Sequence, residues 1–209
     1  LIGSVENLKN PSLTKMYEFF KTYYVANNMA LVISGDFDPE HIKPLIKEKF
    51  GQWERGEIPK AKTYEEPQFE GREFVEKKLS PIKLAMLGFR TVPAGHPDKL
   101  KLEITNSILS NSSQTGLLDH LSTDNKLLAA NAVGLPYQDH GATVFFVIPK
   151  IIGQKLEDAE ELVMNELDKL KKGEFEDWLL DVVKNQYYKN SQRAFESPAN
   201  KAIKIANAF

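Results

Sequence analysis

Cysteine is absent from this chain of 209 residues, and histidine and tryptophan are scarce, with four and two residues. Without cysteine the chain has no disulfide, no cysteine-ligated zinc and no thiol nucleophile. No two histidines stand four residues apart, so no helix face presents two imidazoles to one metal ion. A Gly-x-Ser-x-Gly element and a glycine-rich phosphate loop are missing too. Several common catalytic designs are thereby excluded.

Neither sign of charge is in clear excess, because 27 Lys and Arg stand against 29 Asp and Glu. A general nucleic-acid binder usually carries a basic excess, so we expect no nucleic-acid partner. No apolar run approaches the roughly 18 residues of a membrane span, so we expect none in this segment. The chain starts at Leu1 without a signal segment, and we interpret it as a piece of a longer protein of unknown compartment.

The first 53 residues are predicted to form a helix, a strand and a second helix. Asn10-Pro11-Ser12 is a helix-start signal, because a capping residue and proline are favoured there. The continuous apolar run Met29–Ile33 is typical of a strand covered on both faces. Asp38-Pro39 begins the second helix, in which Pro44 predicts a bend because it removes one backbone donor.

Residues 54–71 are polar, charged and interrupted by proline, which predicts a linker. Beyond the linker the pattern predicts strands 72–79 and 82–92, helices 98–109 and 114–121, strands 126–135 and 142–148, and helices 156–173 and 175–188, the last continuing toward 209 with a break near Pro198. Paired strands that alternate with paired helices indicate an α+β domain. Its sheet is predicted to be mostly antiparallel, with helices packed on one face.

The side chains offer little chemistry of their own. His140 follows Asp139 in a stretch that we interpret as a polar hairpin turn. His120 follows Asp119 on a short amphipathic helix, where we expect a partly buried structural histidine. The acidic stretch 157–161 is interpreted as a solvated helix start, which the helix dipole favours. The four histidines are His41, His96, His120 and His140. The residues alone therefore predict a soluble α+β domain without a visible active site.

A series of short motifs resembles one protein family. In order and with the family's spacing, they are Ile-Gly-Ser-Val-Glu-Asn-Leu at 2–8, the stretch 17–29, Val-Ile-Ser-Gly-Asp-Phe-Asp at 32–38, and Lys-Phe-Gly-Gln-Trp at 49–53. Weaker similarities continue at 87–89, 108–117 and 173–179. Over essentially its whole length, the chain resembles the insulinase/pitrilysin/mitochondrial-processing-peptidase superfamily of zinc metallopeptidases, the inverzincins.

This resemblance implies a zinc site that the segment itself lacks. Family members bind zinc through His-x-x-Glu-His on a helix and a downstream glutamate, and the glutamate inside the motif activates water. No His-x-x-Glu-His occurs here, and helix 98–109, at the place equivalent to the zinc helix, begins Asp-Lys-Leu-Lys-Leu-Glu. We therefore expect no catalytic residue, no cofactor-binding residue and no metal ligand in this segment, and zinc in the parent protein.

A second pair of family residues is also missing. In the later half of long family members, an arginine and a tyrosine seven residues further on reach the substrate at the zinc site. Ser122 and Ala129 stand at the matching positions here. Neither can supply a charge or a phenol to a transition state. The resemblance thus places this segment in the first half of a two-half peptidase.

The resemblance also implies a domain organisation. Residues 1–53 would be the tail of a preceding catalytic-type domain, 54–71 a linker, and 72–209 an inactive peptidase-like domain, a metallopeptidase-like half-repeat truncated at its C-terminus. The expected function is that of a non-catalytic domain of a zinc metalloendopeptidase that helps to enclose peptide substrate beside neighbouring peptidase domains. The alternative is a structural, catalytically dead subunit that pairs with an active one. An unrelated small-molecule-binding domain is a third interpretation.

The predicted strand in the first segment needs a partner, because an open strand edge is costly. We expect residues 29–34 to pair with the sheet formed from 72–92 and 126–148, either within the chain or by exchange between two copies, which would give a homodimer. The same segment predicts one packed helix-on-strand unit. Its members are Phe19, Phe20, Tyr23, Leu31 and Ile33.

Overall fold

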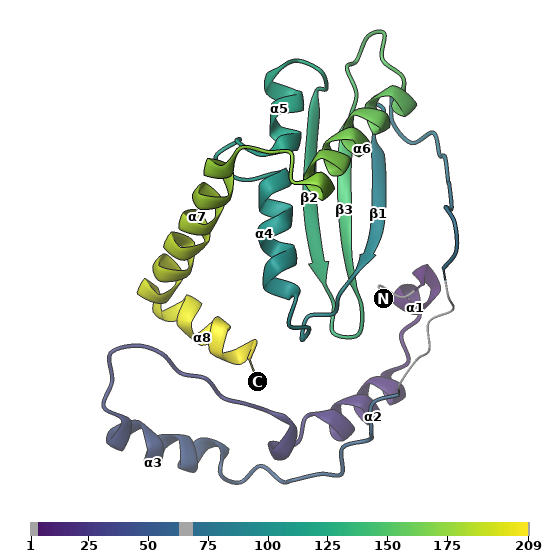
Figure 1. The fold of residues 1–209 in the computed structure, drawn as a ribbon. Helices are drawn as coiled ribbons and strands as arrows, with labels where there is room; N and C mark the ends of the chain where they lie inside the picture. The colour runs from purple at the N-terminus through teal and green to yellow at the C-terminus, as the bar shows by residue number, and fades with distance from the viewer. Residues whose placement is uncertain (1–3, 63–68, 209) are drawn as a thin grey trace. The chain divides into compact units, whose positions relative to one another are not determined.

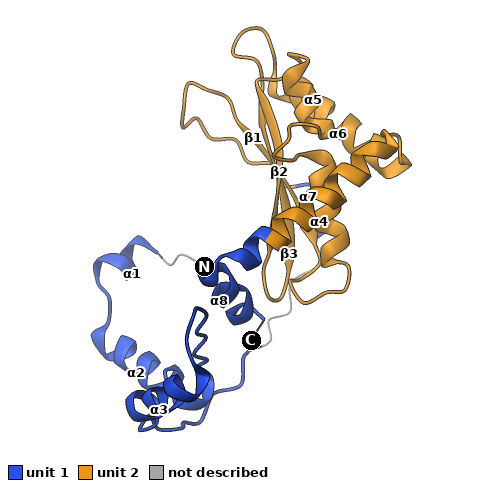
Figure 2. Ribbon diagram, turned by 90° about the vertical axis from the view of Figure 1, so that its left-hand side faces the viewer, with its two compact units in different colours: residues 1–72, 193–209 blue, residues 73–192 orange. Residues whose placement is uncertain are grey.

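The computed structural model describes residues 4–62 and 69–208. The chain divides into two compact units, which Figure 2 shows in two colours. Unit 1 comprises residues 1–72 and 193–209, and unit 2 comprises residues 73–192. Unit 2 holds the sheet and most of the packed helices, so it determines the fold class.

Unit 2 is an antiparallel sheet with helices against one face (Figure 1). Its described strands are β1 (Ala85–Thr91), β2 (Ala129–Pro136) and β3 (Gly141–Ile148), in the order β1-β3-β2. Its helices are α4 (Lys99–Leu109), α5 (Leu117–Thr123), α6 (Leu156–Lys172) and α7 (Asp177–Glu196), of which α7 runs past the unit's last residue. Helices α4 and α5 contact β2, and α6 contacts β3. The predicted α+β class, with a mostly antiparallel sheet and helices on one face, is confirmed.

The central strand β3 explains where the core lies. Its residues alternate between buried and half-buried, as the two-residue period of a strand requires when helices cover one face. Phe145 faces the helices and pairs with Leu87 of β1 and Ala132 of β2. The buried cluster consists of Leu109, Leu118, Leu121, Leu127, Ala130, Phe145, Val147, Ala159 and Val163. The opposite face of the sheet carries the half-buried side chains of β3 and exposed Met86 and Val133.

Unit 1 contains short helices and extended segments. The helices are α1 (Val5–Lys9), α2 (Leu13–Tyr23), the 3₁₀ turn η1 (Ala26–Asn28), α3 (Pro39–Phe50) and α8 (Pro198–Ala206). The predicted helix starts are confirmed, because the Ser12 hydroxyl accepts the Lys15 N–H at 3.4 Å and the Asp38 carboxylate accepts the Glu40 N–H at 2.9 Å. Pro44 lies inside α3 without ending the helix.

The segment that begins the predicted linker is hydrogen-bonded to the 3₁₀ turn η1. The Asn27 side chain donates to the Gly56 carbonyl at 3.0 Å and accepts the Gly56 N–H at 2.8 Å. The Ala26 N–H donates to the Glu54 carbonyl at 3.0 Å. An asparagine amide can satisfy both backbone groups of one residue in this way because it carries a donor and an acceptor. Residues 54–56 are therefore an ordered part of unit 1.

The predicted strand Met29–Ile33 is wrong for the described chain, where the segment belongs to no ladder. The prediction that residues 29–34 pair with the sheet of the same chain is wrong as well. A strand forms only where a partner supplies its hydrogen bonds, and among residues 4–62 and 69–208 no strand pairs with this segment. Leu31, Ile33 and the aromatic residues of α2 remain substantially exposed, so the predicted helix-on-strand unit is also wrong. Exchange between two copies stays a prediction.

One further predicted strand is absent, and several predicted helices and strands begin or end a few residues away from their predicted bounds. Residues 72–79 form no strand, because β1 ends the described sheet on that side and no further partner is present. The predicted strand 82–92 is shorter and spans β1 only. The helix predicted at 114–121 begins at Leu117, since the preceding loop folds onto the end of α4. The break near Pro198 is confirmed, with α7 ending at Glu196 and Ser197 capping α8.

Candidate functional site: helix α4 and the α5–α6 corner

Helix α4 occupies the place where the family resemblance puts a zinc helix, and its start is held by a small polar network. The Asp98 carboxylate accepts from Lys101 Nζ at 2.6 Å, and the Asp98 backbone N–H donates to His96 Nδ1 at 3.1 Å. The Lys101 ammonium keeps the pKa of the Asp98 carboxyl below its usual value, mainly through this hydrogen bond. All three side chains thus serve the helix start, a structural role.

The four histidines belong to four different elements or loops. His41 lies on α3 in unit 1, His96 precedes α4, His120 lies on α5, and His140 lies in the turn before β3. Among residues 4–62 and 69–208, no three His, Asp or Glu side chains are grouped so that they could hold a metal ion. A catalytic zinc site needs three protein ligands around an open position. The described residues do not fit a zinc ion.

Helix α4 meets α7 through a carboxylate and a phenol. Tyr187 on α7 donates its hydroxyl to Glu103 Oε2 on α4 at 3.3 Å. Partial burial raises the pKa of the Tyr187 phenol above its ordinary value, and the Glu103 carboxylate raises it further. The phenol is therefore a hydrogen-bond donor at neutral pH. Glu103 Oε1 also lies 3.8 Å from Lys99 Nζ, one turn earlier on α4, so the carboxylate interacts with a cation as well as with the phenol.

The loop between α4 and α5 is organised by one carboxylate. Asp119 accepts the N–H groups of Asn111 at 3.0 Å and Gly116 at 2.9 Å, and the Ser110 hydroxyl at 2.9 Å. Asp119 is the third residue of α5, where a carboxylate can satisfy the free N–H groups of a helix start. His120, which the sequence predicted to be a partly buried structural histidine, is exposed instead, so that expectation is wrong.

Ser122 and Ala129 lie at the two ends of the connection from α5 to β2. Ser122 is in the last turn of α5, and Ala129 opens β2 opposite Ile148. They bring neither a guanidinium nor a phenol to this part of the unit. The expectation that the segment contains no substrate-contacting pair here remains a prediction.

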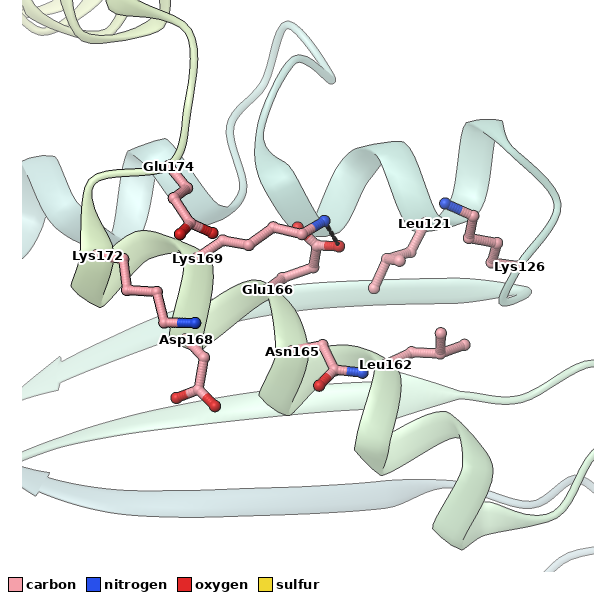
Figure 3. Close-up of a pocket in the computed structure, with 9 residues that line it drawn as sticks. All are labelled: Leu121, Lys126, Leu162, Asn165, Glu166, Asp168, Lys169, Lys172 and Glu174. Atoms are coloured by element: carbon pink, nitrogen blue, oxygen red, sulfur yellow. Dashed lines mark hydrogen bonds and ion pairs between the residues drawn. The ribbon is translucent and has the colours of Figure 1, made fainter.

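Two shallow hollows flank the end of α6. The first, about 450 Å³, lies between α5 and α6, and Figure 3 shows the side chains that line it. The second, about 470 Å³, lies beside His120, Phe175 and Trp178. The two hollows share Lys169 and Glu174.

Glu166 is the buried charge of the first hollow. The residue is 7% exposed, and its carboxylate accepts from Lys169 Nζ at 2.8 Å, the contact drawn as a dashed line in Figure 3. A buried carboxylate is tolerated when a cation and a hydrogen bond compensate it. Charges of both signs line the hollow, and no nucleophile is paired with a base in it. This ion pair lies within α6 and offsets the cost of burying the Glu166 carboxylate.

Sequence reasoning missed both carboxylates. Glu166 stands three residues after buried Val163 and four before Leu170, on the apolar stripe of α6, so the helical spacing could have placed it inside. Asp119 follows Gly116 by three residues, the spacing of a capping box. Both signals were present but weak, because acidic residues on helices are usually solvated.

We expect the purified chain to carry no stoichiometric zinc and to hydrolyse no peptide. The zinc motif is missing from the sequence, and the histidines lie apart from one another. Elemental analysis after dialysis against zinc, combined with a peptide-cleavage assay, measures both properties. One zinc per chain that is lost when two histidines are replaced by alanine would contradict this expectation.

Two curated proteins are similar to parts of this chain. The chain is 26% identical over 197 residues to core protein I of the mitochondrial ubiquinol-cytochrome-c reductase complex of Euglena gracilis, which covers 80% of the chain and 39% of that protein. It is 29% identical over 113 residues to the zinc protease YmfH of Bacillus subtilis, covering 53% of the chain and 26% of that protein. The chain thus spans well under half the length of either relative.

The fold has a close counterpart among solved structures. A protease from Helicobacter pylori superposes with a TM-score of 0.80 at 22% identity, covering 99% of this chain and 51% of that chain. The family model described as the peptidase M16 inactive domain matches residues 12–187, which include part of unit 1, the predicted linker and most of unit 2. The chain belongs to the peptidase M16 inactive domain family.

Proposed function

We propose that this chain is a non-catalytic part of a zinc metalloendopeptidase and that the open face of its sheet helps to enclose the peptide substrate. The observation that carries the proposal is a sheet backed by helices on one side only. Met86 and Val133 stand exposed on the other side, beside the half-buried side chains of β3. Exposed apolar surface of this kind marks interaction sites, which suits contact with a peptide.

The zinc in this proposal belongs to the parent protein, outside these residues. A relative named a zinc protease supports this placement, as does the absence of the His-x-x-Glu-His motif from the present sequence. Zinc held elsewhere in the parent would polarise the scissile carbonyl and activate water. The residues of this chain would contribute only binding and exclusion of solvent.

The proposed domain organisation is that residues 1–53 complete a preceding peptidase-type domain, 54–71 link, and 72–209 form the inactive domain. The exposed apolar side chains of α2 and of residues 29–33 support the first part, since they lack the sheet that would cover them. A neighbouring peptidase domain is therefore the proposed partner of unit 1.

The test uses the complete gene product that contains this segment. We expect hydrolysis of unfolded peptides that a zinc chelator abolishes and added zinc restores. Val133→Lys should lower kcat/KM several-fold for long peptides and leave short peptides unaffected. Leu100→Lys, at an exposed position of α4 on the helix side of the sheet, is the matched control and should change neither. Equal effects of both variants would contradict a role for the open face.

A structural, catalytically dead subunit is the second candidate function. The relative from Euglena gracilis is named a core protein of a respiratory complex, and it matches 80% of the chain. Under this alternative, the complete gene product lacks His-x-x-Glu-His upstream of Leu1 and has no chelator-sensitive activity by itself. The same assay and the upstream sequence therefore distinguish the two functions.

A further inference from the structure

Gly88 lies in the middle of strand β1, on the open face of the sheet. Glycine in a strand interior costs stability, because it loses the most conformational freedom on folding and has no side chain to pack. Such a glycine usually has one of three structural reasons: a β-bulge, a positive φ, or a second group that approaches the backbone closely. The structure distinguishes among these reasons at Gly88.

The first two reasons do not apply to Gly88. The ladder between β1 and β3 pairs residue with residue from Ala85 to Thr91, so no bulge interrupts it. The φ of Gly88 is not positive, since the described glycines with positive φ are Gly71, Gly153 and Gly173. An alanine or a valine could therefore adopt the backbone conformation of Gly88 without strain.

The third reason, close approach of another group, has no source within the described chain. Nothing lies within 4 Å of a Cβ built at Gly88. Gly134 of β2 differs, because its Cβ would lie 3.1 Å from Asn106 Nδ2 of α4, on the helix side of the sheet. Packing against a helix thus explains Gly134, whereas Gly88 faces open space. A group that approaches Gly88 would come from outside the described residues.

The residues beside Gly88 form a row of short side chains across the open face. Gly88 pairs with Val144 of β3, which pairs with Val133 of β2. We call residues 88, 144 and 133 the glycine row. The next row along the strands contains the longer side chains of Met86 and Phe146. The two rows that flank the glycine row lie about 13 Å apart at roughly 3.3 Å per residue, which leaves room for an extended peptide chain.

We propose that an extended peptide substrate crosses the sheet along the glycine row, with its main chain against Gly88. This contact presupposes the proposed function of the open face and specifies which part of the substrate that face binds. A glycine lets an approaching main chain come into van der Waals contact with the strand, and main-chain atoms are common to all peptides. The open face thus accepts extended peptides of many sequences.

An extended chain suits this row better than a helix does. Successive side chains of an extended chain point to opposite sides, so its main chain is accessible, whereas a helix surrounds its main chain with side chains. Val144 and Val133 continue the row with apolar surface, against which apolar side chains of the peptide pack. The sheet makes this contact; among residues 4–62 and 69–208, no helix is long and apolar enough to cross a membrane.

The test measures peptide binding by the complete gene product in the presence of a zinc chelator, so that the peptide is not cleaved. The probe is a fluorescein-labelled, unstructured peptide of four Lys-Val-Glu-Ala-Ser repeats, and its fluorescence anisotropy reports binding. Gly88→Val should raise the dissociation constant about tenfold, because the branched side chain holds the peptide main chain away from β1. The urea midpoint of the 209-residue chain should stay unchanged or rise, since valine is favoured over glycine in a strand.

The matched control is Gly95→Val in the loop before α4, where nothing lies within 4 Å of the Cβ either. This control should change neither the dissociation constant nor the urea midpoint. A second probe carries N-methyl groups on its backbone amides, which keep its main chain away from the strand. It should bind more weakly than the first probe, and Gly88→Val should weaken its binding little further.

The outcomes separate this contact from the proposed function. If Val133→Lys raises the dissociation constant and Gly88→Val does not, the main-chain contact is wrong while the proposed function of the open face stands. If the protein does not bind the probe, or neither variant changes the dissociation constant, the proposed function fails as well. A lower urea midpoint of Gly88→Val, or a changed oligomeric state in sedimentation velocity, also overturns the proposal, because the glycine then packs within the chain or against a second copy.

Discussion

Replacing Leu118 with alanine is expected to lower the free energy of unfolding of unit 2 by about 3–5 kcal/mol, the range for a Leu-to-Ala change at a fully buried site. Leu118 on α5 is 0% exposed and lies in the cluster between the helices and the sheet. The cost has two parts, the lost transfer free energy of the side chain and the cavity left among rigid neighbours. The backbone of α5 cannot collapse into that cavity, because Asp119 fixes its first turn to the preceding loop.

Urea unfolding followed by Trp178 fluorescence, in a Trp53→Phe background, measures this loss in unit 2. Leu100→Ala is the matched control on neighbouring α4, where the leucine is 47% exposed. It should cost less than about 1 kcal/mol, because no fully enclosed cavity forms. Similar losses at both positions would show that α5 does not close the core in the way described.

The elements of unit 2 could be predicted because their signals are local and mutually consistent. Residues 142–148 are rich in apolar and β-branched side chains, and turn-forming residues separate them from a second such run, which together indicate a hairpin. The stripe of α6 repeats at helical spacing and ends at Gly173, whose φ of +71° suits a helix C-terminus. These features require no knowledge of the partner that covers them.

The strand predicted at Met29–Ile33 failed for a different reason. An apolar run predicts that a segment is buried in the folded protein, but it does not identify the element that buries it. The described chain provides no strand beside this segment, so the run remains extended and partly exposed. Strand pairing is a non-local property, and a short sequence pattern cannot establish that the partner is present.

From the sequence we expect no site residue in this segment, and that expectation stays a prediction. It rests on the missing His-x-x-Glu-His motif, which is a feature of the sequence alone. The contacts of Glu166 with Lys169 and of Asp119 with three donors were not predicted. Each depends on how a loop or a helix face is placed against its neighbour, which spacing along the chain only suggests.

Gly116 provides the second prediction with a large effect. A Cβ at this position would lie 2.4 Å from the Leu109 carbonyl oxygen and 2.8 Å from the Ser110 backbone nitrogen. Both atoms belong to the backbone at the end of α4, so they cannot rotate away. Gly116→Ala is therefore expected to lower the free energy of unfolding by about 2–3 kcal/mol, the cost of overpacking at a rigid site.

Serine at the same position separates two explanations. Gly116 is the N-cap of α5, and serine is usually preferred over glycine at an N-cap. If capping dominated, Gly116→Ser would stabilise unit 2. Because any Cβ meets the same backbone atoms, we expect serine to destabilise as much as alanine does. Gly88→Ala on β1 is the control, since nothing lies within 4 Å of its Cβ, and it should be neutral. A stabilising Gly116→Ser in urea unfolding would contradict the close approach of the α4–α5 loop to the end of α4.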